Sequence, residues 1–154
     1  MQRFRLCLTG SVIVCLLAAC NPSDRTPGVW LRGEAAEFPA DWAFSDAYPE
    51  VAVEVATPYF VRHSVTIWCA QLDGTLYIGA AAPEEKNWPG WVDDDPNVRL
   101  LVGESIYSAE LVDVDDPMVI EPLLQAYKVK YDLDSTGIFS EGTRYWRVAA
   151  PMGS

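Results

Sequence analysis

The segment Val61-Arg-His-Ser-Val-Thr-Ile-Trp-Cys-Ala-Gln-Leu-Asp73-Gly74-Thr-Leu-Tyr-Ile-Gly-Ala-Ala81 decides the fold of this chain. Two runs rich in β-branched and aromatic residues, 61–72 and 75–81, flank the dipeptide Asp73-Gly74. Asp-Gly suits the positive φ values of a type I′ turn, which joins two antiparallel strands. We therefore predict a β-hairpin centred on this dipeptide, and with it an antiparallel sheet.

Other stretches add strands to this sheet. Three valines alternate with other residues over 51–56, which is the period of a strand with one buried face. The runs 98–102 and 105–114 flank Gly103-Glu104, and Gly at the first turn position fits a type II′ hairpin. Residues 144–150 have the composition of a last strand.

One helix is predicted after the second hairpin. Asp116-Pro117 resembles a helix start, with an acidic cap and Pro at the first helical position. Because Pro122 inside a helix costs about 3 kcal/mol, we expect regular helix to begin only at Glu121. Apolar residues follow this start at helical spacing, at Ile120, Leu123, Leu124, Tyr127 and Tyr131.

The aromatic residues over 29–48 have no clean period, so a loop or short helix that wraps the core is expected there.

Composition bounds the classes of protein that remain. The chain has 154 residues, 50% of them hydrophobic, with Lys+Arg 11 against Asp+Glu 22 and a net charge of −11. Such a chain buries enough apolar surface to offset the entropy of ordering, so one folded domain is expected and disorder is excluded. The acidic balance argues against a nucleic-acid partner, because phosphates require a basic face.

The N-terminus has the features of a bacterial lipoprotein signal. Arg3 and Arg5 precede an apolar stretch over 6–19, and Leu17-Ala-Ala-Cys20 resembles a lipobox, after which the new terminal Cys is lipidated. We therefore expect residues 1–19 to be a signal peptide. The alternative, an uncleaved membrane helix, is disfavoured because the apolar stretch is too short to span roughly 30 Å of hydrocarbon.

The lipobox divides the chain into an anchor and a domain. We expect Cys20 to carry the lipid, residues 20–28 to form a polar tether, and residues 29–154 to form the domain. In bacterial lipoproteins an Asp after the lipidated Cys commonly retains the protein at the inner membrane. Asn21 stands there, which favours the outer membrane, facing the periplasm.

Processing changes the charge and the thiol count of the mature chain. Loss of two Arg leaves Lys+Arg 9 against Asp+Glu 22, a net charge of −13, so the surface should repel anionic lipid. Cys7 and Cys15 leave with the signal, and Cys20 carries lipid, so no disulfide can form. Cys69 lies in an apolar run, where a buried inert thiol is favoured over a nucleophile.

The order of these elements and several short motifs resemble a known family. Its residues are Thr66-Ile-Trp68, Asp73-Gly-Thr-Leu-Tyr-Ile-Gly79, Lys86-Asn-Trp88 and Asp95-Pro-Asn-Val-Arg-Leu100. They resemble the FMN-binding split barrel of the pyridoxamine 5′-phosphate oxidase-like superfamily, over roughly residues 52–114. The resemblance implies a mainly β fold with one or two helices, a split β-barrel, and a homodimer with a flavin site across its interface.

The resemblance also implies a phosphate site. Arg62 and Lys86 match the positions that hold the flavin phosphate in that family, and cations with spare donors suit a dianion. Trp88 offers a ring that can stack on a flat cofactor, although two Trp near a turn are more often a plug of the core. The chain departs from the family at Glu84-Glu85, where a hydroxyl is expected and two carboxylates would repel phosphate.

Metal and hydrolytic sites are not supported. His63 is the single histidine and lacks partners at ligand spacing, so no zinc site is expected. Residues 132–143 begin like a calcium loop, but Thr143 stands where a bidentate Glu is required.

Two functions stay open from the sequence. The first is a membrane-anchored periplasmic split barrel that binds a flavin-like cofactor such as FMN, with or without an oxidoreductase activity, in which the flavin supplies the electron chemistry. The second is a non-catalytic split-barrel lipoprotein that acts as a binding or envelope-interaction module. Glu84-Glu85 and the net charge favour the second.

Overall fold

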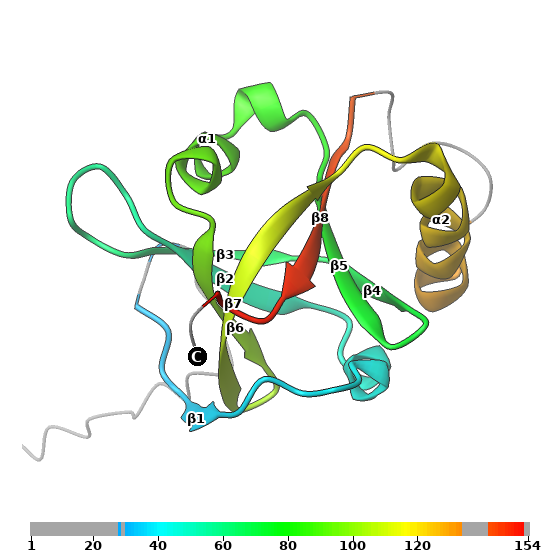
Figure 1. Ribbon diagram of the computed structural model, residues 1–154, viewed down its shortest axis with the longest axis horizontal. Helices are drawn as coiled ribbons and strands as arrows, with labels where there is room; N and C mark the ends of the chain where they lie inside the picture. Colours follow the sequence, from blue (N-terminus) through cyan, green and yellow to red (C-terminus); the bar gives the residue numbers. More distant parts are fainter. Residues whose placement is uncertain (1–27, 29, 134–141, 153–154) are drawn as a thin grey trace, which may run out of the picture.

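The fold is a curled, mainly antiparallel sheet with two α-helices, seen in a computed structural model that describes residues 28, 30–133 and 142–152 (Figure 1). The expected mainly β class is confirmed. The elements are β1 (Glu34–Ala36), η1 (Ala43–Ala47), β2 (Val51–Val55), β3 (His63–Ile67), β4 (Cys69–Leu72), β5 (Thr75–Ala80), η2 (Pro83–Glu85), α1 (Asn87–Asp94), β6 (Asn97–Val102), β7 (Ser105–Val114), α2 (Pro117–Tyr131) and β8 (Arg144–Ala149).

The strand order explains how the sheet closes. It runs β3-β2-β6-β7-β8-β5-β4, and β1 pairs with β7 as a parallel strand outside this path. The two end strands, β3 and β4, are consecutive in the chain and are separated only by Trp68. The sheet therefore curls until its ends meet through one residue, which is the architecture of a split barrel.

The predicted hairpin at Asp73-Gly74 is confirmed. β4 pairs with β5 from Cys69 opposite Ile78 to Leu72 opposite Thr75, and the two turn residues have φ values of 50° and 76°. The prediction of one uninterrupted strand over 61–72 is wrong, because the chain passes at Trp68 from pairing with β2 to pairing with β5. One periodic segment thus supplies both ends of the barrel.

The second hairpin and the last strand are also confirmed. Val102 lies opposite Ser105 across a two-residue turn, in which Gly103 has φ +63°. The Tyr48 hydroxyl would lie only 2.7 Å from a Cβ at Gly103, so this turn needs glycine for space as well as for φ. β8 then pairs with both β5 and β7.

Replacing Gly74 by Val is expected to lower the free energy of unfolding by more than about 1 kcal/mol, because a β-branched residue is strained at φ +76°. A Cβ there would also meet the carboxyl group of Asp41 at 3.1 Å. Urea denaturation measures the change. Gly90→Ala in α1 is the matched control, since its Cβ would meet nothing within 4 Å and helix propensity favours Ala. An unchanged midpoint for the Val variant would contradict the turn.

The strand β2 is buried on both faces, although its alternation predicted one buried face. All five of its residues are buried, including Glu54, which is 0% exposed. The N-terminal segment covers the second face, where Leu31 packs with Ala52, Leu101 and Ile106. The sequence pattern missed this because the covering segment lies more than twenty residues away in the chain.

The region 29–48 wraps the core as expected, and it contains a strand that was not predicted. β1 pairs with β7, and the 3-10 helix η1 follows. Trp42 precedes η1, is almost fully buried, and contacts the rings of Phe38, Phe44 and Tyr107 at centroid distances of 5.1 to 5.6 Å. The backbone N–H of Trp42 also donates to the carbonyl of Gly74, 2.9 Å away, which joins this region to the first hairpin.

The two Trp residues at 88 and 91, which the sequence placed near a turn, lie instead in the helix α1, so that part of the prediction is wrong. Pro89 lies in the first turn of the helix, where a missing N–H breaks no intrahelical bond. Trp88 and Val92 are four residues apart and enter the core together. Burial of these two side chains outweighs the weak helix propensity of Pro89 and Gly90.

The helix α2 follows its predicted cap and face. The Asp116 carboxylate accepts a hydrogen bond from the N–H of Met118 at 2.9 Å, and Leu123 and Tyr127 are buried. The helix begins at Pro117, so the expected start at Glu121 is wrong. Pro122 removes the hydrogen bond to the carbonyl of Met118, an exposed residue of the first turn, where solvent can replace the missing donor.

Candidate functional site

A groove opens between η1, β4 and α2. Its volume is 520 Å³. Figure 1 shows α2 lying beside β4 at the outer end of the curled sheet. The groove is lined by Asp46, Ala70, Gln71, Leu72, Pro122, Gln125, Ala126, Val129 and Lys130. Apolar side chains from β4 and α2 thus stand beside one cation, one carboxylate and two amides.

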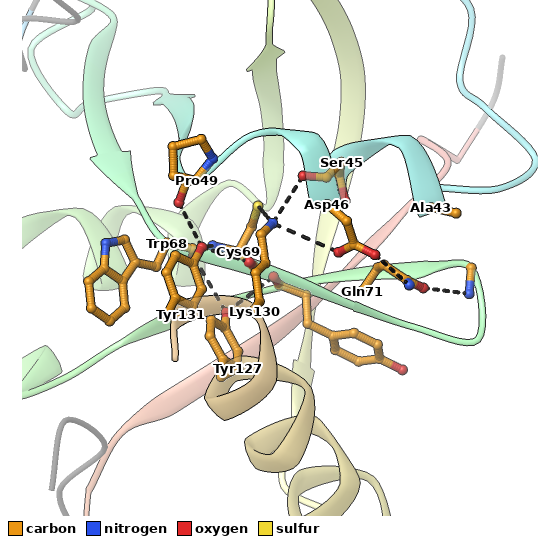
Figure 2. A network of polar contacts seen from close by, with 12 residues as sticks. Ala43, Ser45, Asp46, Pro49, Trp68, Cys69, Gln71, Tyr127, Lys130 and Tyr131 are labelled. Atoms are coloured by element: carbon orange, nitrogen blue, oxygen red, sulfur yellow. Dashed lines mark hydrogen bonds and ion pairs between the residues drawn. The ribbon is translucent and has the colours of Figure 1, made fainter. Parts of the chain in front are cut away.

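Lys130 is the cation of this groove and is held from several directions. Its ammonium donates to the carbonyl of Ser45 at 3.0 Å and lies 3.3 Å from the sulfur of Cys69 (Figure 2). The Asp46 carboxylate lies 4.0 Å away, and the Lys130 side chain is only 9% exposed. The ammonium therefore joins the last turn of α2 to η1 and to β4.

Asp46 and Gln71 continue the network along the groove. The Gln71 amide donates to the Asp46 carboxylate at 2.9 Å, and its oxygen accepts from the N–H of Gly74 at 3.0 Å (Figure 2). Gln71 therefore carries the contact from η1 to the turn of the first hairpin. The carboxylate and the amide are oriented before any ligand arrives.

Cys69 is buried beneath this network, as the sequence predicts. Burial raises the pKa of the thiol, and the neighbouring Lys130 ammonium offsets only part of that effect. A thiol with a raised pKa stays protonated near neutral pH and is a poor nucleophile. The Lys130 contact could not be foreseen, because 61 residues separate it from Cys69.

Two tyrosines of α2 hold the helix against β4 and β5, next to the groove. The Tyr131 hydroxyl accepts from the N–H of Cys69 at 3.0 Å and lies 2.8 Å from the carbonyl of the same residue. Its ring stacks on Trp68 at 4.4 Å, and the Tyr127 hydroxyl donates to the carbonyl of Tyr77 at 3.2 Å. Burial raises the pKa of both tyrosines, so both hydroxyls stay neutral. These hydrogen bonds join α2 to the backbone of β4 and β5.

Lys86 lies away from this groove, between η2 and α1. Its ammonium donates to the carbonyl of Ala81 and lies 3.4 Å from that of Ala82. Glu84 and Glu85 precede it in η2, and both are exposed. The ammonium is therefore occupied by its own loop and stands beside two carboxylates.

Trp88 and Arg62, the other two predicted site residues, occupy different environments. Trp88 is 6% exposed, and its ring packs on Trp146 at a centroid distance of 5.0 Å. Arg62 precedes β3, and within the described residues its guanidinium has no hydrogen bond or ion pair. Among the described residues, no hydrogen bond, ion pair or ring contact joins Arg62 to Lys86 or to Trp88, although the His63 ring lies 5.4 Å from the Trp91 ring of α1.

The fit of these residues to FMN can be tested on this geometry. A phosphate needs cations with spare donors, and a flavin ring needs an open aromatic face. Two backbone carbonyls accept from the Lys86 ammonium, Trp88 is almost fully buried, and of the three only Arg62 has no hydrogen bond or ion pair among the described residues. As arranged, the three residues do not make a complete FMN site, and FMN binding stays a prediction.

The remaining sequence-based predictions concern metals and the anchor. In residues 28, 30–133 and 142–152, no three His, Cys, Asp or Glu side chains gather as a metal site, and no helix is long and apolar enough to cross a membrane. Asp132 ends α2 with φ +50°. The rest of the calcium-like segment over 134–141, the signal segment 1–19 and Cys20 lie outside the described residues.

Comparisons with known proteins agree on the fold. The sequence matches no protein-family model and no curated protein. Among solved structures, a Listeria innocua protein named as a putative pyridoxamine 5′-phosphate oxidase is similar with a TM-score of 0.54 and 15% identity, over 70% of this chain and 87% of its own. A FAD-binding protein from Mesorhizobium loti has a TM-score of 0.51 and 15% identity, over 68% and 81%.

A third structure, described as a domain-swapped dimer, has a TM-score of 0.50 and 12% identity, over 66% of this chain and 80% of its own. At such identities the likeness shows the fold alone. The chain therefore has the split-barrel fold of the pyridoxamine 5′-phosphate oxidase-like proteins, as the sequence motifs implied.

Proposed function

We propose that this protein is a lipid-anchored split barrel of the bacterial cell envelope that acts as a non-catalytic binding module. The lipobox-like segment ending at Cys20 supports the anchor, and Asn21 supports the outer membrane, facing the periplasm. One observation carries the proposal of a module without a flavin. The cation and the ring that would hold FMN, Lys86 and Trp88, already serve the loop and the core of this chain.

The groove between η1, β4 and α2 is where the module would take its ligand. Lys130 and Asp46 stand on one side, and the apolar side chains of Ala70, Leu72 and Ala126 help to line the wall. Such a lining suits a small polar ligand that carries an apolar part and that needs orientation without chemistry. The raised pKa of the Cys69 thiol is consistent with binding and not with nucleophilic attack.

A homodimer is part of the proposal. Similarity to a structure described as a domain-swapped dimer supports it. The family resemblance in the sequence points in the same direction, because split barrels of that family build their site across a two-fold interface.

Flavin binding is the second candidate function. Two observations favour it, namely the likeness to a FAD-binding protein and the guanidinium of Arg62, which has no hydrogen bond or ion pair among the residues that the structure describes. In that case Arg62 would meet the phosphate, and Lys86 would have to leave the carbonyls of Ala81 and Ala82. A bound flavin would supply redox chemistry, and the chain would supply position and charge.

A flavin titration separates the two candidates. If the protein is a module without a flavin, FMN and riboflavin should bind weakly and with affinities within about twofold of each other, because no paired cations meet the phosphate. Lys86→Ala and the double variant Glu84→Ser, Glu85→Ser should leave this result unchanged. Fluorescence quenching of each flavin by the detergent-solubilised full chain gives both affinities, and Lys128→Ala on α2 is the control for loss of a lysine.

The opposite pattern would establish the flavin candidate. FMN would then bind at least about tenfold more tightly than riboflavin, since a charge-assisted hydrogen bond contributes about 1.5–3 kcal/mol. Lys86→Ala would remove most of that preference, and the two serines would increase it by removing repulsion. The visible absorption spectrum of the purified chain would also show a retained flavin.

A further inference from the structure

The loop between β2 and β3 presents three consecutive apolar side chains to solvent. Tyr59 is 68% exposed, Phe60 is 101% exposed, and Val61 is 66% exposed. Figure 1 shows this loop projecting from the sheet at the left of the view, on the side opposite α2. Large apolar residues exposed together at a loop tip mark an interaction surface more often than isolated ones do.

Hydrogen bonds hold the loop in this conformation. The N–H of Phe60 donates to the carbonyl of Thr57 at 3.1 Å, and the Thr57 hydroxyl donates to the carbonyl of Val61 at 2.6 Å. Phe60 has φ +62°, a value that costs a bulky residue free energy. The Tyr59 ring meets Trp91 of α1 edge-on at 6.2 Å. Phe60 is therefore fully exposed to solvent in a backbone conformation that is strained for a bulky residue.

The described chain begins beside the foot of this loop. The N–H of Gly28 donates to the carbonyl of Ser64 at 2.6 Å, and a Cβ at Gly28 would lie 3.6 Å from the His63 ring. His63 and Ser64 are the first two residues of β3, directly after the loop. Cys20 and Gly28 are eight residues apart, a distance that spans at most about 29 Å when fully extended. A lipid on Cys20 therefore keeps this end of the domain near the bilayer.

The loop carries a cation next to its apolar residues, on a chain that is acidic as a whole. The mature chain would carry a net charge of −13, which repels anionic headgroups. Arg62 follows the three apolar residues directly and has no hydrogen bond or ion pair among the described residues. Aromatic rings beside a free cation are the side chains that favour the membrane–water interface, where the rings enter the acyl boundary and the cation meets phosphates.

We propose that residues 59–62 form a second membrane contact, in which Tyr59, Phe60 and Val61 enter the headgroup boundary and Arg62 stays at the phosphates. The occupant of this surface is the bilayer that holds the lipid of Cys20, so the inference rests on the proposed anchor. The loop then fixes the orientation of the barrel, with the groove beside α2 directed away from the membrane.

The experiment places a probe on the loop of the full chain. Phe60→Cys carries an environment-sensitive fluorophore, and Val129→Cys, 83% exposed on α2, carries the same label as a control. Cys69 is buried, and in the processed chain Cys7 and Cys15 are removed and Cys20 carries lipid, so labelling is selective. The proteins are reconstituted in phosphatidylcholine vesicles with and without acyl chains that bear a nitroxide quencher. Quenching at position 60 should exceed that at position 129 by at least about threefold, with a blue-shifted emission.

Each outcome decides the proposal. Equal quenching at both positions, with the full chain in the membrane fraction, would overturn the loop contact and leave the anchor intact. A label at position 60 that is shielded from aqueous iodide but not quenched by lipid would show a protein occupant, which also overturns it. Recovery of the full chain in the soluble fraction would overturn the anchor and the loop contact together. Val61→Cys repeats the measurement if the Phe60 variant fails to fold.

Discussion

Replacing Arg99 by Met is expected to lower the free energy of unfolding by about 3–5 kcal/mol, because it leaves a buried carboxylate without its cation. One guanidinium nitrogen of Arg99 lies 2.9 and 3.1 Å from the two oxygens of Glu54, whose side chain is 0% exposed. The stem of Met preserves most of the packing, so the loss reports the missing charge.

The same carboxylate also holds the N-terminal segment. The N–H of Leu31 donates to Glu54 at 2.7 Å, and after removal of Arg99 this is the one hydrogen bond to Glu54 that the described contacts retain. Leu31 covers Ala52, Leu101 and Ile106 from the second face of the sheet. We therefore expect the segment around Leu31 to loosen together with the ion pair, and amide hydrogen exchange would show faster exchange there.

Urea denaturation of three variants tests this account. The double variant Glu54→Leu, Arg99→Met should recover at least half of the loss, because two apolar side chains replace a pair whose desolvation is costly. Arg147→Met on β8 is the matched control, since that residue is exposed, and it should change stability by less than about 0.5 kcal/mol. A loss of the same size in the control, or a double variant less stable than Arg99→Met, would show that the ion pair is not the cause.

Replacing Cys20 by Ser should move the protein from the membrane fraction to the soluble fraction or leave it unprocessed. The thiol is the atom that would carry the first acyl group, and a Ser at that position cannot form the thioether. Each buried methylene contributes about 0.8 kcal/mol, so two or more acyl chains make the difference close to complete. Membrane fractionation and the mass of the mature N-terminus give the result.

A matched thiol control lies in the same segment. Cys15 belongs to the apolar stretch that would be removed with the signal, so Cys15→Ser should leave processing and membrane partitioning unchanged. If Cys20→Ser stays in the membrane and is cleaved at the same bond, the chain is not anchored through that thiol. The lipid of Cys20 would then no longer support a contact between the loop at Phe60 and a bilayer.

Local chemistry was enough to predict the turns and the long helix. Asp73-Gly74 and Gly103 adopt positive φ because glycine and Asp accept it more readily than most residues do, and Asp116 caps α2 through a side chain two residues from its partner. In each case the interacting groups are neighbours in the chain. A local pattern therefore contains the whole cause.

Patterns with a distant cause were misread. Glu54 stands at a position that the alternation over 51–56 assigns to a solvent face, yet the segment around Leu31 buries it. The dipeptide Pro89-Gly90 is typical of a turn, yet burial of Trp88 and Val92 makes it part of α1. Propensity and period act over a few residues, and tertiary burial of large side chains outweighs both.

The sequence by itself determined the hairpins, the capped helix, the acidic surface and the lipobox-like end, and its short motifs indicated the split barrel that the structure and its neighbours confirm. Only the tertiary structure decided which side chains meet. It joined Lys130 to Cys69 across 61 residues, occupied Lys86 with carbonyls of its own loop, and enclosed Trp88 against Trp146. A site is a set of distances between residues far apart in the chain, and those distances exist only after the sheet has curled and the helices have packed on it.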